Sequence, residues 1–409
     1  MLQQRGHTIR IFTRHSDPRA TDGDIVEEMV EQLAVTSVVN DARGGHFRDH
    51  FLSAGVAEAF RREIKNNPPD IFHFQHLIGL SSDLPMIASA AGIRCVATVH
   101  EYWYACHRVM LQRADLTPCE GPLQRDCVRC VSGESASRRE PPVTSPARAW
   151  LAKIIGRHRA TAAGPAVADE RFQTLRRALA TYDRIVTPSQ FVIEELARQG
   201  MALPPSSTRA IALGLPAPIA VAPEPRATPI SENHPLRLTF IGHLLPHKGP
   251  HILLAAMKQL PELPLQLELH GRRWEQHPYE ESLGPLLKAE PRARAFGTFA
   301  DKALPEILSR TDALVVPSTC PESFGLATRE AMLAGRPVVS TNCGALSESI
   351  REGFDGLLVP GEDPDALAIA LRRLVEEDGL LARLSLGARS APVATMEQYA
   401  STIESFLYR

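Results

Sequence analysis

Two glutamates in the C-terminal half of the chain, Glu322 and Glu330, stand where carboxylates could accept hydrogen bonds from hydroxyl groups of a diol. They belong to the segment 321–335 (PESFGLATREAMLAG), which follows a short apolar run at 314–317. This pattern predicts a buried strand, a proline-containing turn and a helix that begins near Ser323. The first N–H groups of a helix suit oxygen-rich, negatively charged ligands. The residues expected to contact such a ligand are Glu322, Ser323, Phe324, Gly325, Leu326 and Glu330.

A second candidate element precedes this segment at 240–249 (FIGHLLPHKG). It predicts a strand, a glycine turn and a helix that opens near His247. Gly242 would let the backbone approach a ligand closely. Lys248 could reach a diphosphate as a point charge. The two elements together predict one site for an anionic ligand with hydroxyl groups.

Two histidines in the N-terminal half, His76 and His100, stand at the ends of predicted strands at 71–75 and 95–100. The carboxyl ends of parallel strands meet at one edge of a sheet, so both imidazoles are expected to face the same ligand cleft. A lone histidine is more often a structural residue, and that interpretation stays open for each of them.

The glutamate pair encloses Phe-Gly, and Glu330 begins the sequence Glu-Ala-Met-x-Ala-Gly-x-Pro-Val-Val. This pattern resembles the retaining glycosyltransferases of family 4, which have the GT-B fold. The resemblance implies transfer of a hexosyl unit from a UDP- or GDP-linked sugar to a glycan or lipid-linked acceptor, with retention of configuration and no obligatory metal. It places Glu322 on a sugar hydroxyl and Glu330 on the ribose hydroxyls. The alternative is a solvated helix with two surface glutamates.

The same resemblance implies roles for residues outside the glutamate pair. It places His100 near the reacting sugar and Gly271 beside the nucleotide base. The family often has arginine directly after the glycine at Gly242, where this chain has His243. An ordinary imidazole is largely neutral at pH 7, so phosphate binding is expected to depend more on Lys248 than usual. The catalytic residues expected on this basis are His100, Lys248 and Glu322.

The elements that position these residues follow an α/β pattern, in which short β-branched runs alternate with helical stretches. We expect two Rossmann-like domains that face each other across a cleft. A proline- and alanine-rich stretch at 217–235 predicts the linker. The predicted parts are an acceptor domain at 1–220 with a cysteine-containing insertion at 104–150, a donor domain at 236–392, and a segment at 393–409, with a helix at 397–408, that packs back on the first domain.

The opening residues 2–13 (LQQRGHTIRIFT) resemble the end of the family's first helix and its second strand. The usual first strand and glycine-rich loop would then be missing. A first strand is central in a Rossmann-type sheet, so its absence is expected to leave a gap. A second hypothesis is therefore a non-catalytic nucleotide-sugar-binding remnant. An epimerase would need acid/base carboxylates that the first half does not offer, and a dehydrogenase would need Gly-x-Gly-x-x-Gly after a strand.

Four cysteines lie close together in the predicted insertion, and the last two have the Cys-x-x-Cys spacing of metal ligands. A structural zinc is one interpretation, and a loop with free thiols is the other. An iron–sulfur cluster is a weaker alternative. The candidate ligands are Cys106, Cys119, Cys127 and Cys130.

Composition sets outer limits on function. The formal net charge of −2 over 409 residues gives no overall field for nucleic acid. No apolar run approaches the roughly 20 residues of a membrane-spanning helix, and the opening lacks the apolar core of a signal peptide, so a cytoplasmic protein is expected. The stretch 138–177 is rich in Lys and Arg. Within it, 145–160 could lie on the inner membrane face or pack on the first domain.

Overall fold

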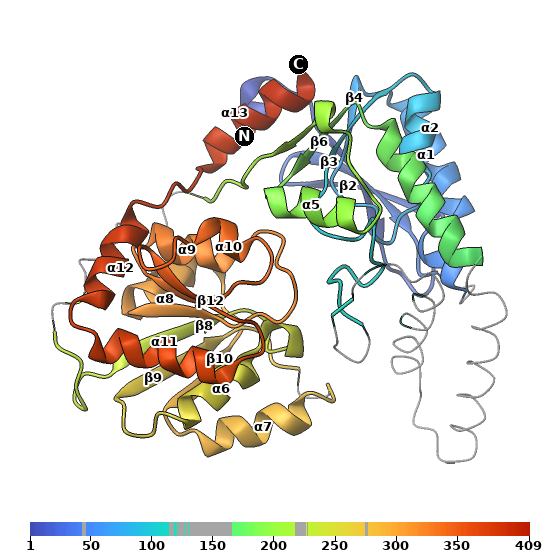
Figure 1. The fold of residues 1–409 in the computed structure, drawn as a ribbon. Coiled ribbons are helices and arrows are strands. Elements are labelled where there is room, and N and C mark those ends of the chain that lie inside the picture. The colour runs from blue at the N-terminus through green and yellow to red at the C-terminus, as the bar shows by residue number, and fades with distance from the viewer. Residues whose placement is uncertain are drawn as a thin grey trace, which may run out of the picture. The chain divides into compact units, whose positions relative to one another are not determined.

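The computed structural model describes residues 1–409 apart from 43–45, 114–117, 120, 122–126, 128–129, 131–165, 217–225, 227 and 275–276. The described chain divides into two compact units (Figure 1). The first comprises Met1–Ile211 together with Ala400–Arg409, and the second comprises Ala212–Tyr399. No helix among the described residues is long and apolar enough to cross a membrane.

The strands of the first unit form two separate sheets. One has the order β1-β3-β2, in which β2 is antiparallel, and the other has the parallel order β4-β5-β6-β7. Among the described residues no strand pairs with the second edge of β1 or of β4, so the two sheets do not join. The strands are β1 (Arg10–His15), β2 (Ile25–Val30), β3 (Leu33–Val39), β4 (Ile71–Phe74), β5 (Arg94–Thr98), β6 (Arg184–Thr187) and β7 (Thr208–Ala210).

Helix α1 packs against both sheets of the first unit. It begins where the Ser53 hydroxyl accepts a hydrogen bond from the backbone N–H of Val56, which satisfies a free donor of the first turn. The ring of Phe60 on this helix lies 5.2 Å from that of Phe12 and 4.9 Å from that of Phe72. Side chains therefore link the two sheets where strands do not. The labelled helices of this unit are α1 (Ala54–Asn66), α2 (Leu84–Ala90) and α5 (Gln190–Arg198), and residues 166–181 are also helical.

The C-terminal residues pack on the first unit. Helix α13 (Met396–Ile403) continues into a π-helical turn, Glu404–Tyr408, instead of the single α-helix that the sequence predicts. The Tyr408 hydroxyl lies 2.7 Å from Nδ1 of His73. The guanidinium of Arg94 donates to the backbone oxygen of Tyr408 at 3.1 Å. These contacts fix the end of the chain beside β4 and β5.

Two connecting segments pair with each other in the second unit. The N–H of Leu215 donates to the oxygen of Ala394 at 2.9 Å, and the N–H of Met396 donates to the oxygen of Leu215 at 3.0 Å. This pairing keeps both segments with the second unit. The chain therefore enters that unit at Ala212 and leaves it after Tyr399, whereas the sequence predicts a donor domain at 236–392.

The second unit is built on one parallel sheet of six strands, in the order β10-β9-β8-β11-β12-β13. The central strands β8, β11 and β12 are rich in Val and Leu and almost fully buried, as expected when helices cover both faces of a parallel sheet, whereas the edge strand β10 is mostly exposed. The strands are β8 (Leu236–Ile241), β9 (Leu265–His270), β10 (Ala293–Gly297), β11 (Ala313–Val316), β12 (Val338–Thr341) and β13 (Gly356–Val359).

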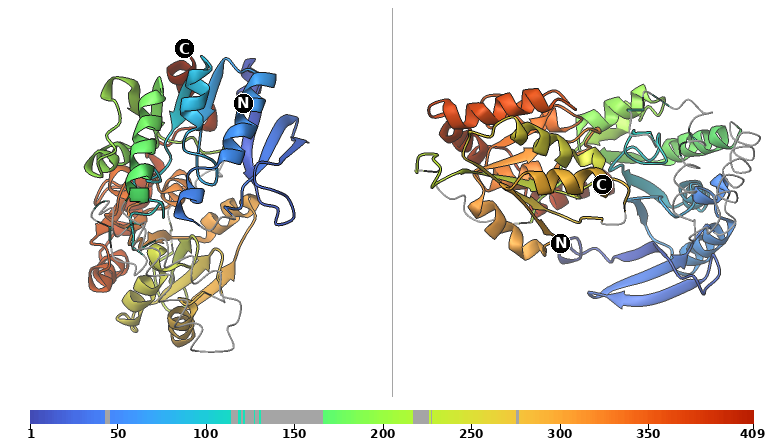
Figure 2. Two further views of the ribbon diagram at one scale, coloured as in Figure 1. Left: turned by 90° about the vertical axis from the view of Figure 1, so that its right-hand side faces the viewer. Right: turned by 90° about the horizontal axis from the view of Figure 1, so that it is seen from below.

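Helices cover both faces of this sheet (Figures 1 and 2). Helices α6, α7 and α11 contribute to one apolar cluster, α8 and α9 contribute to another on the opposite face, and α12 contributes to both. The helices of this unit are α6 (Pro250–Lys258), α7 (Glu280–Ala289), α8 (Leu304–Arg310), α9 (Leu326–Leu333), α10 (Leu346–Ser349), α11 (Pro364–Glu376) and α12 (Leu380–Arg389).

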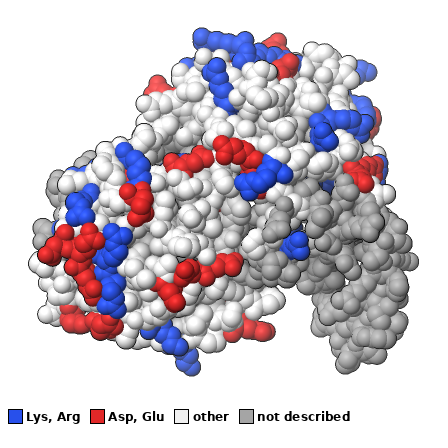
Figure 3. Space-filling view, in the orientation of Figure 1, with Lys and Arg blue, Asp and Glu red and all other residues white. Residues whose placement is uncertain are grey.

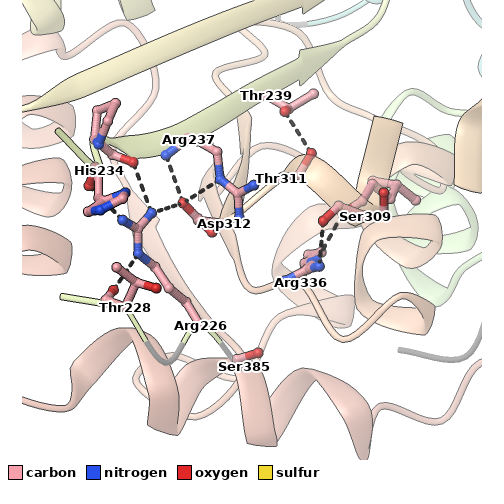
Figure 4. A network of polar contacts seen from close by, with 12 residues as sticks. Arg226, Thr228, His234, Arg237, Thr239, Ser309, Thr311, Asp312, Arg336 and Ser385 are labelled. Atoms are coloured by element: carbon pink, nitrogen blue, oxygen red, sulfur yellow. Dashed lines mark hydrogen bonds and ion pairs between the residues drawn. The ribbon is translucent and has the colours of Figure 1, made fainter. Parts of the chain in front are cut away.

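A buried carboxylate joins the starts of two central strands of the second sheet (Figure 4). Asp312, which is fully buried, accepts hydrogen bonds from the side chain and backbone N–H of Arg237 at 2.6 and 2.9 Å. Arg226 lies 2.6 Å from the same carboxylate and also donates to the backbone oxygen of Pro235. This network ties the connecting segment to the sheet at the edge opposite the strands' carboxyl ends. Elsewhere on the surface, acidic and basic side chains are interspersed on the face that Figure 3 shows.

Candidate functional site

The candidate site lies at the carboxyl edge of the second sheet, where all six parallel strands end. Ligands of open α/β sheets bind at this edge, because the loops and helix N-termini there point away from the strands. Three segments supply the predicted residues: 242–249 after β8, 271–274 after β9 and 317–325 after β11.

Lys248 and Glu322 meet at this edge. The Lys248 ammonium lies 2.6 Å from Oε1 of Glu322, and the Ser318 hydroxyl donates to the same oxygen at 2.6 Å. Burial alone would raise the pKa of the Glu322 carboxyl, but Lys248 and Ser318 outweigh it and hold this pKa below its usual value. The pKa of Lys248 is raised, because Glu322 outweighs the effect of burial. Both groups are therefore charged at neutral pH.

Backbone contacts hold these two residues in place. Lys248 ends a 3₁₀ turn at Pro246–Lys248, and α6 begins only after it, so the predicted helix near His247 starts at Pro250 instead. The N–H of Thr319 donates to the oxygen of His247 at 2.9 Å. The oxygen of Glu322 accepts from the N–H of Ala345 at 2.8 Å. The segments after β8 and β11 are thus tied to each other and to the segment after β12.

The segments after β8 and β9 approach each other through two glycines. A Cβ atom added to Gly271 would lie 1.8 Å from the oxygen of Gly242, so no other residue fits at this position without a shift of the backbone. The N–H of Gly242 donates to the oxygen of His270 at 2.9 Å, and that of Leu244 donates to the oxygen of Arg272 at 3.0 Å. The predicted ligand-binding turn after β8 is therefore packed against a second turn, which follows the adjacent strand β9.

Helix α9 begins at Leu326, three residues later than the predicted Ser323, because Gly325 has a positive φ of 74° that an α-helix does not accommodate. The guanidinium of Arg329 lies 3.7 Å from the ring centroid of Phe324 and donates to the backbone oxygen of the same residue. Burial lowers the pKa of Arg329 to about 10, which leaves it charged at neutral pH. This arginine, which the sequence does not single out, fixes the loop before the helix.

Glu330 lies in the second turn of α9 and is partly buried. Its pKa is raised, first by burial and then by the charge of Asp301. Its carboxylate has no hydrogen-bond or ion-pair partner among the residues that the structure describes. A partly buried carboxylate without a partner is costly unless something completes its hydrogen bonds. It can accept two hydrogen bonds from a diol.

The predicted histidines of the first unit lie at the carboxyl ends of β4 and β5. Nε2 of His76 lies 3.1 Å from the carboxylate of Glu101. Nε2 of His100 lies 2.8 Å from Oε1 of Gln75, so this ring nitrogen donates and the other nitrogen is left as an acceptor. Burial, and then the charge of His76, lowers the pKa of His100, which is therefore neutral at pH 7.

Sequence reasoning missed three residues around these histidines. Gln75 and Glu101 position the rings. His73, partly buried between Thr98 and Tyr408, has a pKa lowered to about 4, chiefly by desolvation of its ring. The alternation His-x-Gln at the end of β4 places His73 and Gln75, the residue directly after the strand, on the same face, which is a signal that the sequence does contain.

The four cysteines of the predicted insertion are among the described residues and carry no disulfide. Burial raises the pKa of the Cys127 thiol to about 11, and the neighbouring thiols of Cys106 and Cys119 add to this. No group of three or more His, Cys, Asp or Glu side chains in the described ranges is placed to hold a metal ion. The proposed membrane-contacting stretch 145–160 lies outside those ranges.

The fold is shared by solved structures of GT-B glycosyltransferases. A sucrose-phosphate synthase from Thermosynechococcus elongatus has a TM-score of 0.62 at 20% identity, over 100% of this chain and 88% of that one. HepE from Anabaena, solved in complex with UDP and glucose, has a TM-score of 0.61 at 18% identity, over 92% of this chain and 86% of that one. At this identity the likeness establishes the GT-B fold.

Sequence profiles identify the family. The profile described as Glycosyltransferase Family 4 matches residues 1–216, and the profile described as Glycosyl transferases group 1 matches residues 224–391. The chain belongs to glycosyltransferase family 4, as its glutamate motif predicts.

Two curated relatives carry the name D-inositol 3-phosphate glycosyltransferase. The protein from Corynebacterium urealyticum is 35% identical over 147 residues, which are 34% of each chain. The protein from Nocardioides sp. is 37% identical over 166 residues, which are 37% of this chain and 36% of that one. The aligned part thus spans about a third of the length of these relatives.

Proposed function

We propose that this protein transfers a hexosyl unit from a UDP- or GDP-linked sugar to a glycan or lipid-linked acceptor, with retention of anomeric configuration. The observation that carries the proposal is the pairing of Lys248 with Glu322, 2.6 Å apart, in the same unit as the unpartnered carboxylate of Glu330. One cation and two carboxylates match the diphosphate, the sugar hydroxyl and the ribose diol of a nucleotide sugar. HepE, a protein with the same fold, is described in complex with UDP-glucose.

The proposed chemistry builds negative charge on the departing diphosphate. Lys248 is charged and partly buried, and a charge held in place at a developing anion stabilises the transition state without reorganisation. Glu322 would hold a sugar hydroxyl and keep Lys248 at this point. Gly242 and the N–H groups before α9 offer further donors to phosphate oxygens. In this proposal these residues provide the positive potential, and no metal ion is required.

His100 is the proposed catalytic residue of the first unit, near the reacting sugar, with His76 on the acceptor side. The hydrogen bond from His100 to Gln75 supports this role, because it leaves the neutral His100 ring with an acceptor nitrogen for a hydroxyl group. The acceptor's class, a glycan or lipid-linked molecule, is proposed from the resemblance to the family alone; the two relatives above are named D-inositol 3-phosphate glycosyltransferase, a name that specifies neither.

A non-catalytic nucleotide-sugar-binding protein is the second candidate. The observation that favours it is the division of the first unit's strands into two sheets, since an acceptor domain usually has one. The two candidates make the same prediction for donor binding and opposite predictions for turnover.

The experiment that separates them follows donor consumption. Purified protein is incubated with UDP-glucose, UDP-galactose, UDP-N-acetylglucosamine and GDP-mannose, with and without EDTA, and released nucleotide is measured. The enzyme predicts release from one donor, unaffected by EDTA and reduced in the Lys248→Ala variant. Binding of a nucleotide sugar without any release, with or without membrane lipid as acceptor, would favour the remnant. Absence of binding would contradict both.

We propose, from their spacing alone, that the four cysteines bind a structural zinc that would order the insertion at 104–150; within the described residues, their side chains are not gathered into a metal-holding group. Their spacing supports it, and thiolates are preferred zinc ligands. Elemental analysis of the purified protein should find about one zinc per chain. Less than about a tenth of an equivalent, also after expression with added zinc, would contradict this proposal.

A peripheral membrane contact through 145–160 is proposed separately, and co-sedimentation with anionic vesicles tests it.

A further inference from the structure

The proposed donor site is short of positive charge. A nucleoside diphosphate brings two or more negative charges, whereas the charge of Lys248 is already balanced by Glu322 at 2.6 Å. The position after Gly242 holds His243 rather than an arginine. A second permanent cation near this turn would complete a phosphate site, because guanidinium groups bind phosphate oxygens with two parallel hydrogen bonds.

Such a cation lies on the adjacent strand end. The backbone oxygen of Arg272 accepts a hydrogen bond from the N–H of Leu244 at 3.0 Å. One residue earlier, Gly271 packs so closely on Gly242 that a Cβ would lie 1.8 Å from its oxygen. Arg272 therefore stands directly beside the glycine turn, although it is brought there by β9 and not by β8.

The guanidinium of Arg272 is held by an aromatic ring. It lies 3.7 Å from the ring centroid of Trp274, and the ring of His243 contacts the same indole at 6.3 Å between centroids. Stacking of a guanidinium on an indole restricts its motion while its N–H groups stay available in the plane. A group restricted in this way loses less entropy when an anion binds.

The positive charge of Arg272 is also not neutralised by a described carboxylate. Arg272 is exposed and pairs with no carboxylate among the described residues, whereas the neighbouring Arg273 lies 2.9 Å from a carboxylate oxygen of Glu280. Two adjacent arginines thus differ in what they do. Arg273 fixes the loop to α7, and Arg272 keeps an unneutralised guanidinium at the carboxyl edge of the sheet.

We infer that Arg272, held by Trp274, is the second phosphate-binding cation of the donor site and supplies from β9 the charge that the turn after β8 lacks. The inference rests on the proposed function, because it takes the ligand to be a nucleoside diphosphate. The ligand chemistry that it specifies is the diphosphate and not the base or the sugar.

The test compares ligands that differ only in phosphate. Binding of UDP, UMP and uridine, and of GDP, GMP and guanosine, is measured by calorimetry for the wild type, Arg272→Ala, Arg272→Lys and the matched control Arg273→Ala. Arg272→Ala should raise the Kd of the diphosphate about tenfold and leave that of the nucleoside within about twofold. Arg272→Lys should fall between, and Arg273→Ala should bind both like the wild type. Circular dichroism and thermal unfolding check that each variant is folded.

The outcomes separate this inference from the proposed function. An unchanged diphosphate Kd in folded Arg272→Ala, together with a loss in Lys248→Ala, would overturn the role of Arg272 and leave the donor site intact. An equal loss for diphosphate and nucleoside would also overturn it, because Arg272 would then act on the base or the fold. If the wild type bound neither UDP nor GDP, the proposed function itself would fail and this inference with it.

Discussion

The Lys248 ammonium lies 2.6 Å from the Glu322 carboxylate, although 74 residues separate the two in the chain. The parallel sheet explains this contact, because β8 and β11 are neighbours and both residues follow the carboxyl end of their strand. In the proposed donor complex this ion pair marks the point where the sugar is joined to the diphosphate.

Replacing Lys248 by alanine should weaken diphosphate binding more than nucleoside binding. It also leaves the partly buried Glu322 without its cation, so the pKa of this carboxyl should rise. The expected loss in UDP or GDP affinity is about tenfold or more, since a charge-assisted hydrogen bond is worth roughly 1.5–3 kcal/mol. Calorimetric titration with diphosphate and nucleoside measures it. Equal affinities of variant and wild type for the diphosphate would remove Lys248 from the site.

Glu322→Gln should distinguish binding of the sugar from binding of the nucleotide. The amide keeps the shape but loses the charge, so affinity for the nucleotide sugar should fall by about tenfold. Affinity for UDP or GDP alone should stay the same or increase, because Lys248 is then no longer neutralised. The comparison requires both ligands on both proteins. A variant in which nucleotide and nucleotide sugar lose affinity equally would contradict a role on the sugar.

His100→Ala should lower kcat about 10²-fold or more if this histidine acts on the reacting sugar. Gln75→Leu should have a smaller effect, because it removes only the hydrogen bond that fixes the ring. The pKa of His100 is lowered, so the wild-type rate should stay constant as pH falls through 6.5 and decline only at lower pH. The pH profile of initial rates checks this. A rate that halves near pH 6.5 would indicate an unperturbed histidine instead.

Asp312→Asn should destabilise the second unit by about 3 kcal/mol, because it leaves the partly buried Arg226 without its charge partner. Burial would raise the pKa of this carboxyl, but the hydrogen bonds from Arg237 outweigh it and the net pKa is lowered. A lowered pKa in the folded state contributes stability above the unfolded value of about 3.9. That contribution is lost as the pH falls from about 3.9 through the lowered pKa of the folded state.

The difference in free energy of unfolding between wild type and Asp312→Asn should therefore be large at pH 7 and shrink below about pH 4. Urea titrations at several pH values measure it. The matched control is Glu306→Gln, which removes an exposed pair with Arg310 and should cost about 0.5 kcal/mol or less. A difference that did not change with pH would assign the effect to packing.

The sequence predicts most of the second unit because its buried strands are continuous apolar runs and its helices are amphipathic. It does not predict β2, since Ile25–Val30 lies on an exposed edge and has no alternating pattern. The turn from β2 to β3 uses Glu31 and Gln32 at positive φ, where Gly or Asn usually gives the signal. The sequence also predicts the start of α9 three residues too early, because the positive φ of Gly325 delays the helix until Leu326.

The candidate site is predictable as far as its motif residues. Glu322, Glu330 and Lys248 can be chosen from type and spacing. The pairing of Lys248 with Glu322 and the place of Arg272 beside Gly242 cannot, because they depend on strand order and on backbone contacts between distant segments. Gln75 and Glu101 are found only once β4 and β5 are known to be neighbours.

Glu330 also gives a prediction with a distinct pH dependence. Its carboxylate must be ionised to accept hydrogen bonds from both ribose hydroxyls, and its pKa is raised by burial and by Asp301. Preference for ribose over deoxyribose nucleotides should therefore be present at neutral pH and be lost as pH falls through the raised pKa. The ratio of the two affinities at each pH cancels protonation of the phosphates.

The most direct measurement of the central claim is the affinity of wild type and Glu330→Ala for UDP and 2′-deoxy-UDP, or the matching guanine pair. If Glu330 holds the ribose, the wild type should prefer the ribonucleotide by about tenfold, and the variant should bind both with nearly the lower affinity. A Glu330→Ala variant that kept the wild-type preference would contradict the donor site placed here.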